Sequence, residues 1–167
     1  MKKQVIISII AILFVTIAAS AQTRQPSTAI RSFLVKSKQS LAELEKRIST
    51  ENKVEELIGG AGMETRVAIQ HDKVKNGDPA ELHDASDDVY YVLKGKATLE
   101  LGGKLVDPKE VSPGEWRSQK VIGSQNIEIN EGDLIMVPRG TVHRRTVGGK
   151  GFSMILIKIY EDPLPAK

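Results

Sequence analysis

From Glu64 to the C-terminus, the chain is a succession of short runs rich in β-branched and aromatic residues, separated by Gly, Pro, Asn and Asp. Such runs are typical of β-strands, and the residues between them are typical of turns. Many short strands joined by turns indicate a sandwich or a barrel rather than a parallel sheet. The strands expected on this basis are residues 66–70, 89–93, 97–101, 127–129, 134–137 and 152–160.

The segment around residue 83 places metal-ligating side chains on one face of an extended chain. Glu81 and His83 are two residues apart, so both project to the same side of a strand, and Asp88 can join them from the next strand. A competing register would put Leu82 and Asp84 at the ligand positions. We reject it because leucine cannot bind a metal.

A predicted turn leads to a second candidate ligand. Pro138 fixes its own φ and Gly140 tolerates a positive φ, so these residues favour a turn, after which His143 begins a strand. With the first segment, this gives two imidazoles and two carboxylates, a set that suits divalent iron, manganese, nickel or zinc. Geometry, rather than ligand type, would choose among these metals. The alternative is that all four side chains are surface groups that face water.

Together, the two segments resemble the signature motifs of the cupin superfamily. The first motif reads H-x-H, three or four residues, E, six residues, G; Glu81 stands at its first histidine and Asp88 at its acid. The second reads G, five residues, P-x-G, two residues, H, three residues, N, and only Val147 departs from it. The resemblance implies a mainly β fold, the cupin double-stranded β-helix or jelly-roll barrel, over residues 63–167. It also implies a metal site formed by Glu81, His83, Asp88 and His143.

The sequence does not decide which of the two acids, Glu81 or Asp88, binds the metal directly. Aspartate is one methylene shorter than glutamate, so Asp88 can stop short of the metal and bind a ligated water instead. In that case Glu81 supplies the carboxylate. In the alternative, Asp88 is the direct ligand, as the family pattern implies.

Strand alternation adds two candidates for contact with a substrate. If Asp88 points inward, so does Tyr90, which would donate a hydrogen bond to a metal-bound substrate; the alternative is core packing. If His143 points inward, so does Arg145, whose guanidinium matches a carboxylate or phosphate. The alternative is that Arg145 faces outward, because Arg144 follows His143 directly and one of the two arginines must face solvent.

The N-terminus has the features of a signal peptide over residues 1–21. Lys2 and Lys3 form a basic start, residues 5–19 are a mainly apolar stretch of fifteen residues, and Ala-Ser-Ala follows at residues 19–21. We therefore expect cleavage after Ala21 and a secreted or periplasmic protein. The alternative is a membrane anchor, but the stretch is shorter than a spanning helix requires.

Removal of the signal peptide leaves 146 residues, a size suited to one domain, and lowers the formal net charge from +3 to +1. A nearly neutral chain without a Lys/Arg block argues against a nucleic-acid partner or a charged membrane surface. The chain has no cysteine, so it offers neither a thiol for lipid attachment nor a disulfide.

We expect a loose leader over residues 22–39 and a helical segment over residues 40–62. Residues 40–43 read Ser-Leu-Ala-Glu, a capping-box pattern that predicts a helix from about residue 41 to residue 50. Val54, Leu57 and Ile58 either extend this helix or form a second turn, and the glycines at 59, 60 and 62 end it. The helix is expected to cover one end or the outer face of the barrel.

Residues 106–117 lengthen the connection between the two motifs. Two prolines and a glycine predict an ordered excursion rather than a strand, and the excursion contains Trp116, the only tryptophan of the chain. Two interpretations fit equally well. The excursion is either a lid or dimer contact, or a surface loop with Trp116 tucked against the barrel.

Three functions fit these features. The first is an exported metal-dependent enzyme that acts on a small organic molecule by oxygenation or isomerisation, in which Glu81 or Tyr90 handles protons. The second is a non-catalytic exported module that binds a small ligand or a metal. In the third, the barrel is only a scaffold for a homodimer, and residues 81–88 are a polar rim.

Overall fold

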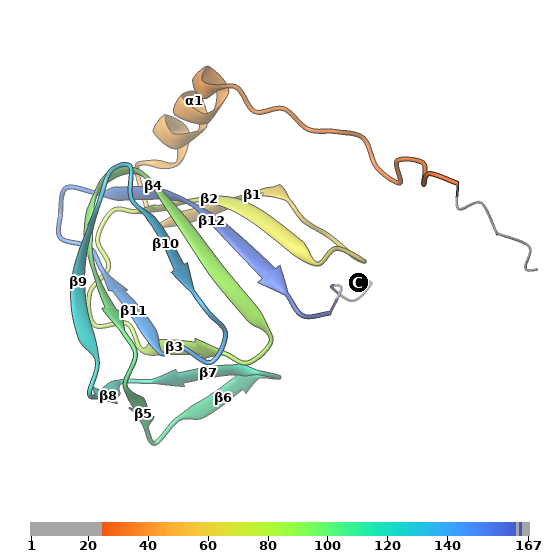
Figure 1. Ribbon diagram of the computed structural model, residues 1–167. Helices are drawn as coiled ribbons and strands as arrows, with labels where there is room; N and C mark the ends of the chain where they lie inside the picture. Colours follow the sequence, from red (N-terminus) through yellow and green to blue (C-terminus); the bar gives the residue numbers. More distant parts are fainter. Residues whose placement is uncertain (1–24, 163, 165–167) are drawn as a thin grey trace, which may run out of the picture. The chain divides into compact units, whose positions relative to one another are not determined.

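The computed structural model describes residues 25–162 and residue 164 (Figure 1). The predicted signal peptide and its cleavage site lie outside the described residues. Residues 25–35 belong to a separate unit and form no helix or strand. All described helices and strands belong to the unit that begins at Lys36. Within the described part of the chain, no helix has the length and apolar character needed to cross a membrane.

Helix α1 (Lys38–Ile48) begins earlier than the capping-box pattern predicts. Its N-cap is Ser37, whose Oγ accepts a hydrogen bond from the backbone amide of Ser40 at 3.1 Å. Leu44 and Ile48 are the buried residues of the helix, and they pack with Ile69. The helix therefore covers the outer face of a sheet, as expected, but its N-terminal signal was the serine three residues upstream.

The predicted helical segment 40–62 is wrong beyond the end of α1. Strand β1 (Lys53–Ile58) occupies the second half and pairs antiparallel with β2 (Thr65–Asp72). Asn52, just before β1, is hydrogen-bonded to the residues that follow β2. Its side chain accepts from the amide of Lys73 at 2.8 Å and donates to the carbonyl of Val74 at 2.8 Å. The apolar spacing of the segment fits a helix as well as a strand, and the free edge of β2 selects the strand.

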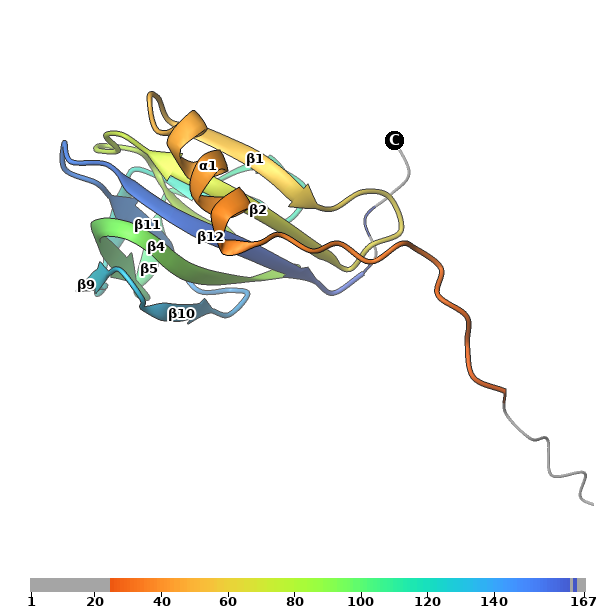
Figure 2. The same cartoon turned by 90° about the horizontal axis from the view of Figure 1, so that it is seen from above.

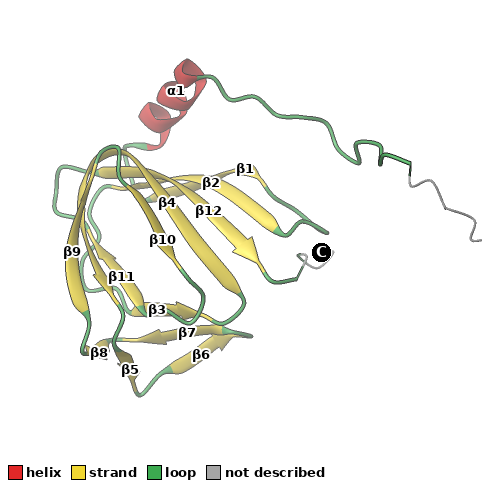
Figure 3. Ribbon diagram, viewed as in Figure 1, coloured by secondary structure: helices red, strands yellow, loops and turns green. Residues whose placement is uncertain are grey.

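Two antiparallel sheets share one long strand, β4 (Ser86–Leu101) (Figures 1 and 3). The first half of β4 pairs with β10 and β12, next to β2 and β1, and its second half pairs with β9 and β11, next to β3. Gly95 lies between the halves with φ 81°, and a side chain there would meet the carbonyl of Gly151. The remaining barrel strands are β3 (Ala80–His83), β9 (Gln125–Asn130), β10 (Leu134–Val137), β11 (His143–Thr146) and β12 (Phe152–Tyr160).

The main buried cluster is built from strands of both sheets. Seen from above, β1, β2, β12 and β4 lie side by side, and α1 lies in front of them (Figure 2). The strands expected at 66–70, 127–129, 134–137 and 152–160 are confirmed, and those at 89–93 and 97–101 are parts of β4. The mainly β fold predicted from sequence is therefore confirmed. The cluster consists of Tyr90, Val92, Ala97, Leu99, Ile129, Val137, Val147, Phe152 and Met154.

The excursion at residues 106–117 is not the strandless segment that its prolines predicted. Strands β6 (Lys109–Ser112) and β7 (Glu115–Ser118) form a hairpin, and β7 adds to the sheet beside β3. Pro113 and Gly114 occupy the turn, where proline removes no ladder hydrogen bond. Two further strands, β5 (Lys104–Val106) and β8 (Lys120–Ile122), pair at the base of the hairpin. Trp116 is tied to its own chain, since its Nε1 donates to Asp84 Oδ2 at 2.7 Å.

Candidate metal centre

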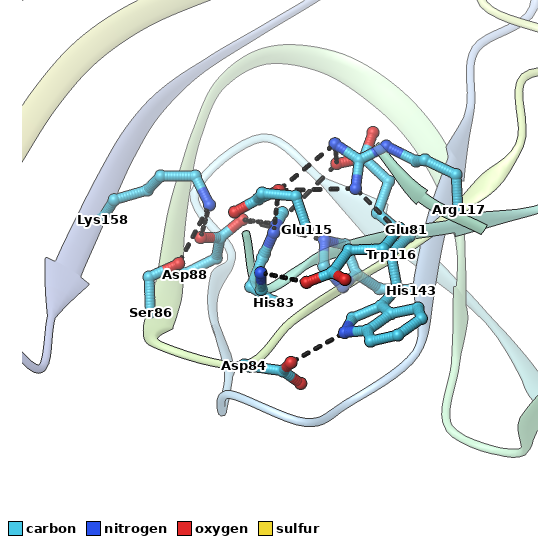
Figure 4. Close-up of polar contacts among 12 residues, drawn as sticks. Glu81, His83, Asp84, Ser86, Asp88, Glu115, Trp116, Arg117, His143 and Lys158 are labelled. Atoms are coloured by element: carbon cyan, nitrogen blue, oxygen red, sulfur yellow. Dashed lines mark hydrogen bonds and ion pairs between the residues drawn. The ribbon is translucent and has the colours of Figure 1, made fainter. Parts of the chain in front are cut away.

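Three of the predicted ligands converge at the end of the barrel closed by β3 and β11 (Figure 4). Glu81, His83 and His143 each offer a ligand atom, and these atoms all lie within 4.8 Å of one another. Both histidines are buried and Glu81 is partly exposed. The structure thus brings together two imidazoles and one carboxylate, a set typical of divalent transition-metal sites.

Backbone geometry explains why these residues meet. Glu81 and His83 share one face of β3, and His143 on β11 is the direct cross-strand partner of Glu81. The turn predicted at Pro138 and Gly140 brings β11 to this position. Gly140 adopts φ 75° and its amide donates to the carbonyl of His83 at 2.8 Å. The chain that leads to one histidine is therefore hydrogen-bonded to the other.

The two imidazoles are oriented through their Nδ1 atoms. His83 Nδ1 lies 2.6 Å from Glu115 Oε2, and His143 Nδ1 lies 3.0 Å from the carbonyl oxygen of Thr141. With Nδ1–H donating to these acceptors, each Nε2 is left with a free lone pair toward the centre. Burial lowers the pKa of His143, which favours the neutral form that binds metals.

A divalent metal fits this donor set. His83 Nε2 is buried and has no hydrogen-bond partner among the described residues, which is costly for a polar atom unless a ligand completes it. It lies 3.7 Å from Glu81 Oε2. Ligand atoms that share a metal at about 2.1 Å in tetrahedral geometry are about 3.4 Å apart, so this pair needs only a small contraction. The unpartnered nitrogen and the three donors within 4.8 Å of one another therefore form a candidate metal site.

Asp88 lies as close to His83 Nε2 as Glu81 does. Its Oδ2 is 3.6 Å from His83 Nε2 and 3.8 Å from His143 Nε2, but its Oδ1 accepts from Lys158 Nζ at 2.7 Å. Burial alone would raise the pKa of Asp88, but the nearby His83 ring and the hydrogen bond and charge of Lys158 hold it at about 2. Asp88 is thus an ionised carboxylate whose charge is shared between an ammonium and the two imidazoles.

Tyr90 lies beside Asp88 on the inner face of β4. Its hydroxyl donates to Asp88 Oδ2 at 3.1 Å, and its ring belongs to the main buried cluster. Burial and the neighbouring Asp88 charge raise the pKa of Tyr90 well above its ordinary value. The Tyr90 ring therefore packs in the hydrophobic core, and its hydroxyl remains protonated next to Asp88.

Arg145 projects inward and Arg144 outward, as alternation from His143 allows. Arg145 is buried, and its Nε donates to Asp72 Oδ2 at 2.9 Å. Its guanidinium also stacks on two rings, with Cζ 5.7 Å from the centre of Tyr90. Arg144 instead pairs with Glu100 at 2.6 Å. Arg145 thus lines the cavity at the metal centre, with its charge already engaged by Asp72.

Sequence reasoning missed three residues that shape the centre. Glu115 orients His83, Lys158 holds Asp88, and Arg117 lies 3.4 Å from both Glu81 Oε2 and Glu115 Oε2 (Figure 4). Glu115 and Arg117 alternate with Trp116 on β7, so the alternation of charged and aromatic residues was a usable strand signal. No local signal marks Lys158, because its contact depends on the pairing of β12 with β4.

The third histidine lies in a different buried cluster. His71 Nδ1 is 2.8 Å from Ser153 Oγ, which donates to Glu45 Oε1 at 2.9 Å. His71 Nε2 also lacks a hydrogen-bond partner among the described residues. An unpartnered nitrogen alone does not make a metal site. The centre at His83 is distinguished by the convergence of further donors on that nitrogen.

No known family profile matches the chain, and no curated protein matches it. Solved structures do. The chain is 17% identical to the BH2720 protein of Bacillus halodurans, with 83% of this chain and 88% of that protein covered and a TM-score of 0.54. A Klebsiella pneumoniae protein with a double-stranded β-helix domain is 15% identical, with 68% and 81% covered and a TM-score of 0.47. KdgF from a Halomonas species is 12% identical, with 68% and 83% covered and a TM-score of 0.47.

The fold predicted from the two motifs agrees with the strand pairing. Two antiparallel sheets enclose the buried cluster, and the metal-centre residues lie on the inner faces of β3, β4 and β11. The match to the Bacillus halodurans structure extends over most of both chains. The chain therefore has the mainly β fold of two antiparallel sheets that the two motifs predicted, and it shares this fold with the Bacillus halodurans structure.

Proposed function

We propose that this protein is an exported metal-dependent enzyme that acts on a small organic molecule by oxygenation or isomerisation. Glu81, His83 and His143 would hold one divalent iron, manganese, nickel or zinc ion. The observation that carries the proposal is the buried Nε2 of His83, which has no hydrogen-bond partner in the described part of the chain and lies 3.7 Å from a carboxylate oxygen of Glu81. Such a nitrogen is stabilised by a bound cation.

The chain's own residues support proton handling next to this centre. A bound divalent metal supplies Lewis acidity, which polarises an oxygen atom of the substrate. Tyr90 holds a proton on its hydroxyl, and Asp88 accepts that hydrogen bond at 3.1 Å. Glu81 is partly exposed, so its carboxylate can exchange protons with a ligand or water. Tyr90 is thus the candidate donor, and Glu81 is a ligand that doubles as the candidate base.

The cavity at the centre limits what can react there. It has a volume of about 80 Å³ and is lined by Glu81, Asp88, Tyr90, His143 and Lys158, among others. This is far below the roughly 300–1,000 Å³ of pockets that enclose drug-sized ligands. Only the reacting end of a small molecule fits inside.

Export and partners complete the proposal. The signal-peptide pattern at residues 1–21 supports a secreted or periplasmic protein, and the charge of +1 after its removal supports a small-molecule ligand rather than nucleic acid or membrane. A homodimer is compatible with the fold. The non-catalytic metal-binding or ligand-binding module is the competing function.

The test is elemental analysis of the natively purified protein, followed by incubation of the metal-loaded protein with small organic acids, sugars and aromatic compounds. We expect about one first-row metal ion per chain and turnover of at least one compound. Metal without turnover would favour the non-catalytic module. A protein that neither retains nor takes up stoichiometric metal would contradict the proposed centre.

The two carboxylates are expected to differ in their contribution to metal affinity. Glu81→Gln should weaken binding strongly because it removes the charged ligand, whereas Asp88→Asn should weaken it by roughly 10- to 100-fold, as is typical for groups that act through a ligand. Metal titration of both purified variants measures the ranking. A larger loss in Asp88→Asn would identify Asp88 as the direct ligand.

A further inference from the structure

The register of the sheet continues the metal centre outward as a row of charged side chains. His143 on β11 pairs with Glu81 on β3, Glu81 pairs with Arg117 on β7, and Arg117 pairs with Lys109 on β6. Direct cross-strand partners project to the same face of a sheet. The row therefore begins at a metal ligand and ends, two strands beyond Glu81, in two cations.

A second cavity lies over the outer end of this row. It has a volume of about 410 Å³, and its lining includes Pro79, Val106, Asp107, Lys109, Arg117 and Lys120. Pro79 also lines the small cavity at the metal centre, so the two cavities adjoin. The volume falls within the range of small-molecule sites, and the lining combines apolar side chains with cations.

The cations of the outer cavity are less engaged than the others near the site. Lys109 and Lys120 form no ion pair with any described residue, and Arg117 reaches Glu81 and Glu115 only at 3.4 Å. By contrast, Arg145 and Lys158 are held by buried carboxylates at 2.5 and 2.7 Å. Asp107 is the one acidic residue in the lining, against Lys109, Arg117 and Lys120, so the cavity carries an excess of positive charge, which favours an anionic ligand.

We propose that the anion pocket, formed by Lys109, Arg117 and Lys120, binds the acidic group of an organic anion whose other end reaches the metal centre. This inference rests on the proposed function and specifies its substrate class. Neighbouring strands are about 5 Å apart, so Arg117 and Lys109 lie roughly 5 and 10 Å across the sheet from Glu81. The ligand is thus a small linear or branched acid with polar groups at both ends.

The test measures binding of adipate, a linear dicarboxylate, to the metal-loaded protein by calorimetry. The double variant Lys109→Gln/Lys120→Gln should bind adipate about tenfold more weakly than the unaltered protein, because two cations of the pocket are lost. Both side chains are exposed, so the variant is expected to fold. Lys96→Gln is the matched control: Lys96 is also exposed but lines neither cavity.

The neutral diamide of adipate separates charge recognition from shape recognition. It should bind the unaltered protein and the double variant equally weakly. Equal adipate affinity in the double variant and the unaltered protein, equal affinity for adipate and its diamide, or no adipate binding at all would each overturn the anion pocket.

Repeating the adipate titration on metal-free protein distinguishes this inference from the proposed function. If adipate binding depends on the lysines but not on metal, the anion pocket stands and the metal-centred function fails. If metal strengthens adipate binding equally in the unaltered protein and the double variant, the metal centre stands and the anion pocket fails. Dependence on both supports the full proposal.

Discussion

Replacing either His83 or His143 with alanine is expected to abolish stoichiometric metal binding while the protein stays folded. Each imidazole presents Nε2 to the centre, and removing one of three converging ligands should weaken binding by more than the roughly 100-fold typical of changes around the ligands. Elemental analysis measures the metal, and circular dichroism measures the fold. Both residues lie outside the main apolar cluster, so their loss leaves that part of the core intact.

His71→Ala is the matched control for this pair. His71 is equally buried, and its Nε2 also lacks a hydrogen-bond partner among the described residues, but no carboxylate and second imidazole converge on it. Metal content should therefore survive in His71→Ala. Metal retained in both His83→Ala and His143→Ala would disprove the centre, and equal metal loss in all three variants would indicate a general effect on folding.

Arg145→Leu is expected to destabilise the protein by about 3–5 kcal/mol, because it leaves the carboxylate of Asp72 buried without its partner. Asp72 is 3% exposed, so water cannot replace the lost guanidinium. Denaturant unfolding of the metal-free protein gives the free energy directly. A second variant, Asp72→Leu/Arg145→Leu, should recover much of the loss, since it removes both charges together.

Arg144→Leu tests whether this effect belongs to the buried pair. Arg144 precedes Arg145 on β11 but pairs with Glu100 where both side chains are partly exposed, so its loss should cost about 1 kcal/mol or less. A similar loss of unfolding free energy in Arg144→Leu and Arg145→Leu would show that the buried Asp72–Arg145 pair contributes no more to stability than the partly exposed pair.

The sequence was sufficient for the parts of the site that depend on short-range geometry. The two-residue spacing of Glu81 and His83 fixed their common face, and the turn at Pro138 and Gly140 correctly predicted the strand that begins at His143. These features follow from backbone conformation over a few residues. They do not require knowledge of which strands pair.

The contacts at the site that the sequence did not predict depend on strand pairing. The acceptor for His83 Nδ1 is Glu115, 32 residues away, and the partner of Asp88 is Lys158, 70 residues away. The helical assignment of residues 53–58 failed for the same reason, because an edge of β2 pairs with a segment whose apolar spacing permits either structure. Local patterns do not encode such partners.

The segment from residue 104 to residue 122, which contains the β6–β7 hairpin, contributes to the site but not to the buried apolar clusters. No member of either buried apolar cluster comes from residues 104–122, yet this segment supplies the acceptor that orients His83 and all three cations of the anion pocket. Substitutions there can change ligand preference at little cost in folding free energy. During evolution, residues 104–122 could therefore acquire contacts to new substrates while the strands beneath them remain constrained by the core.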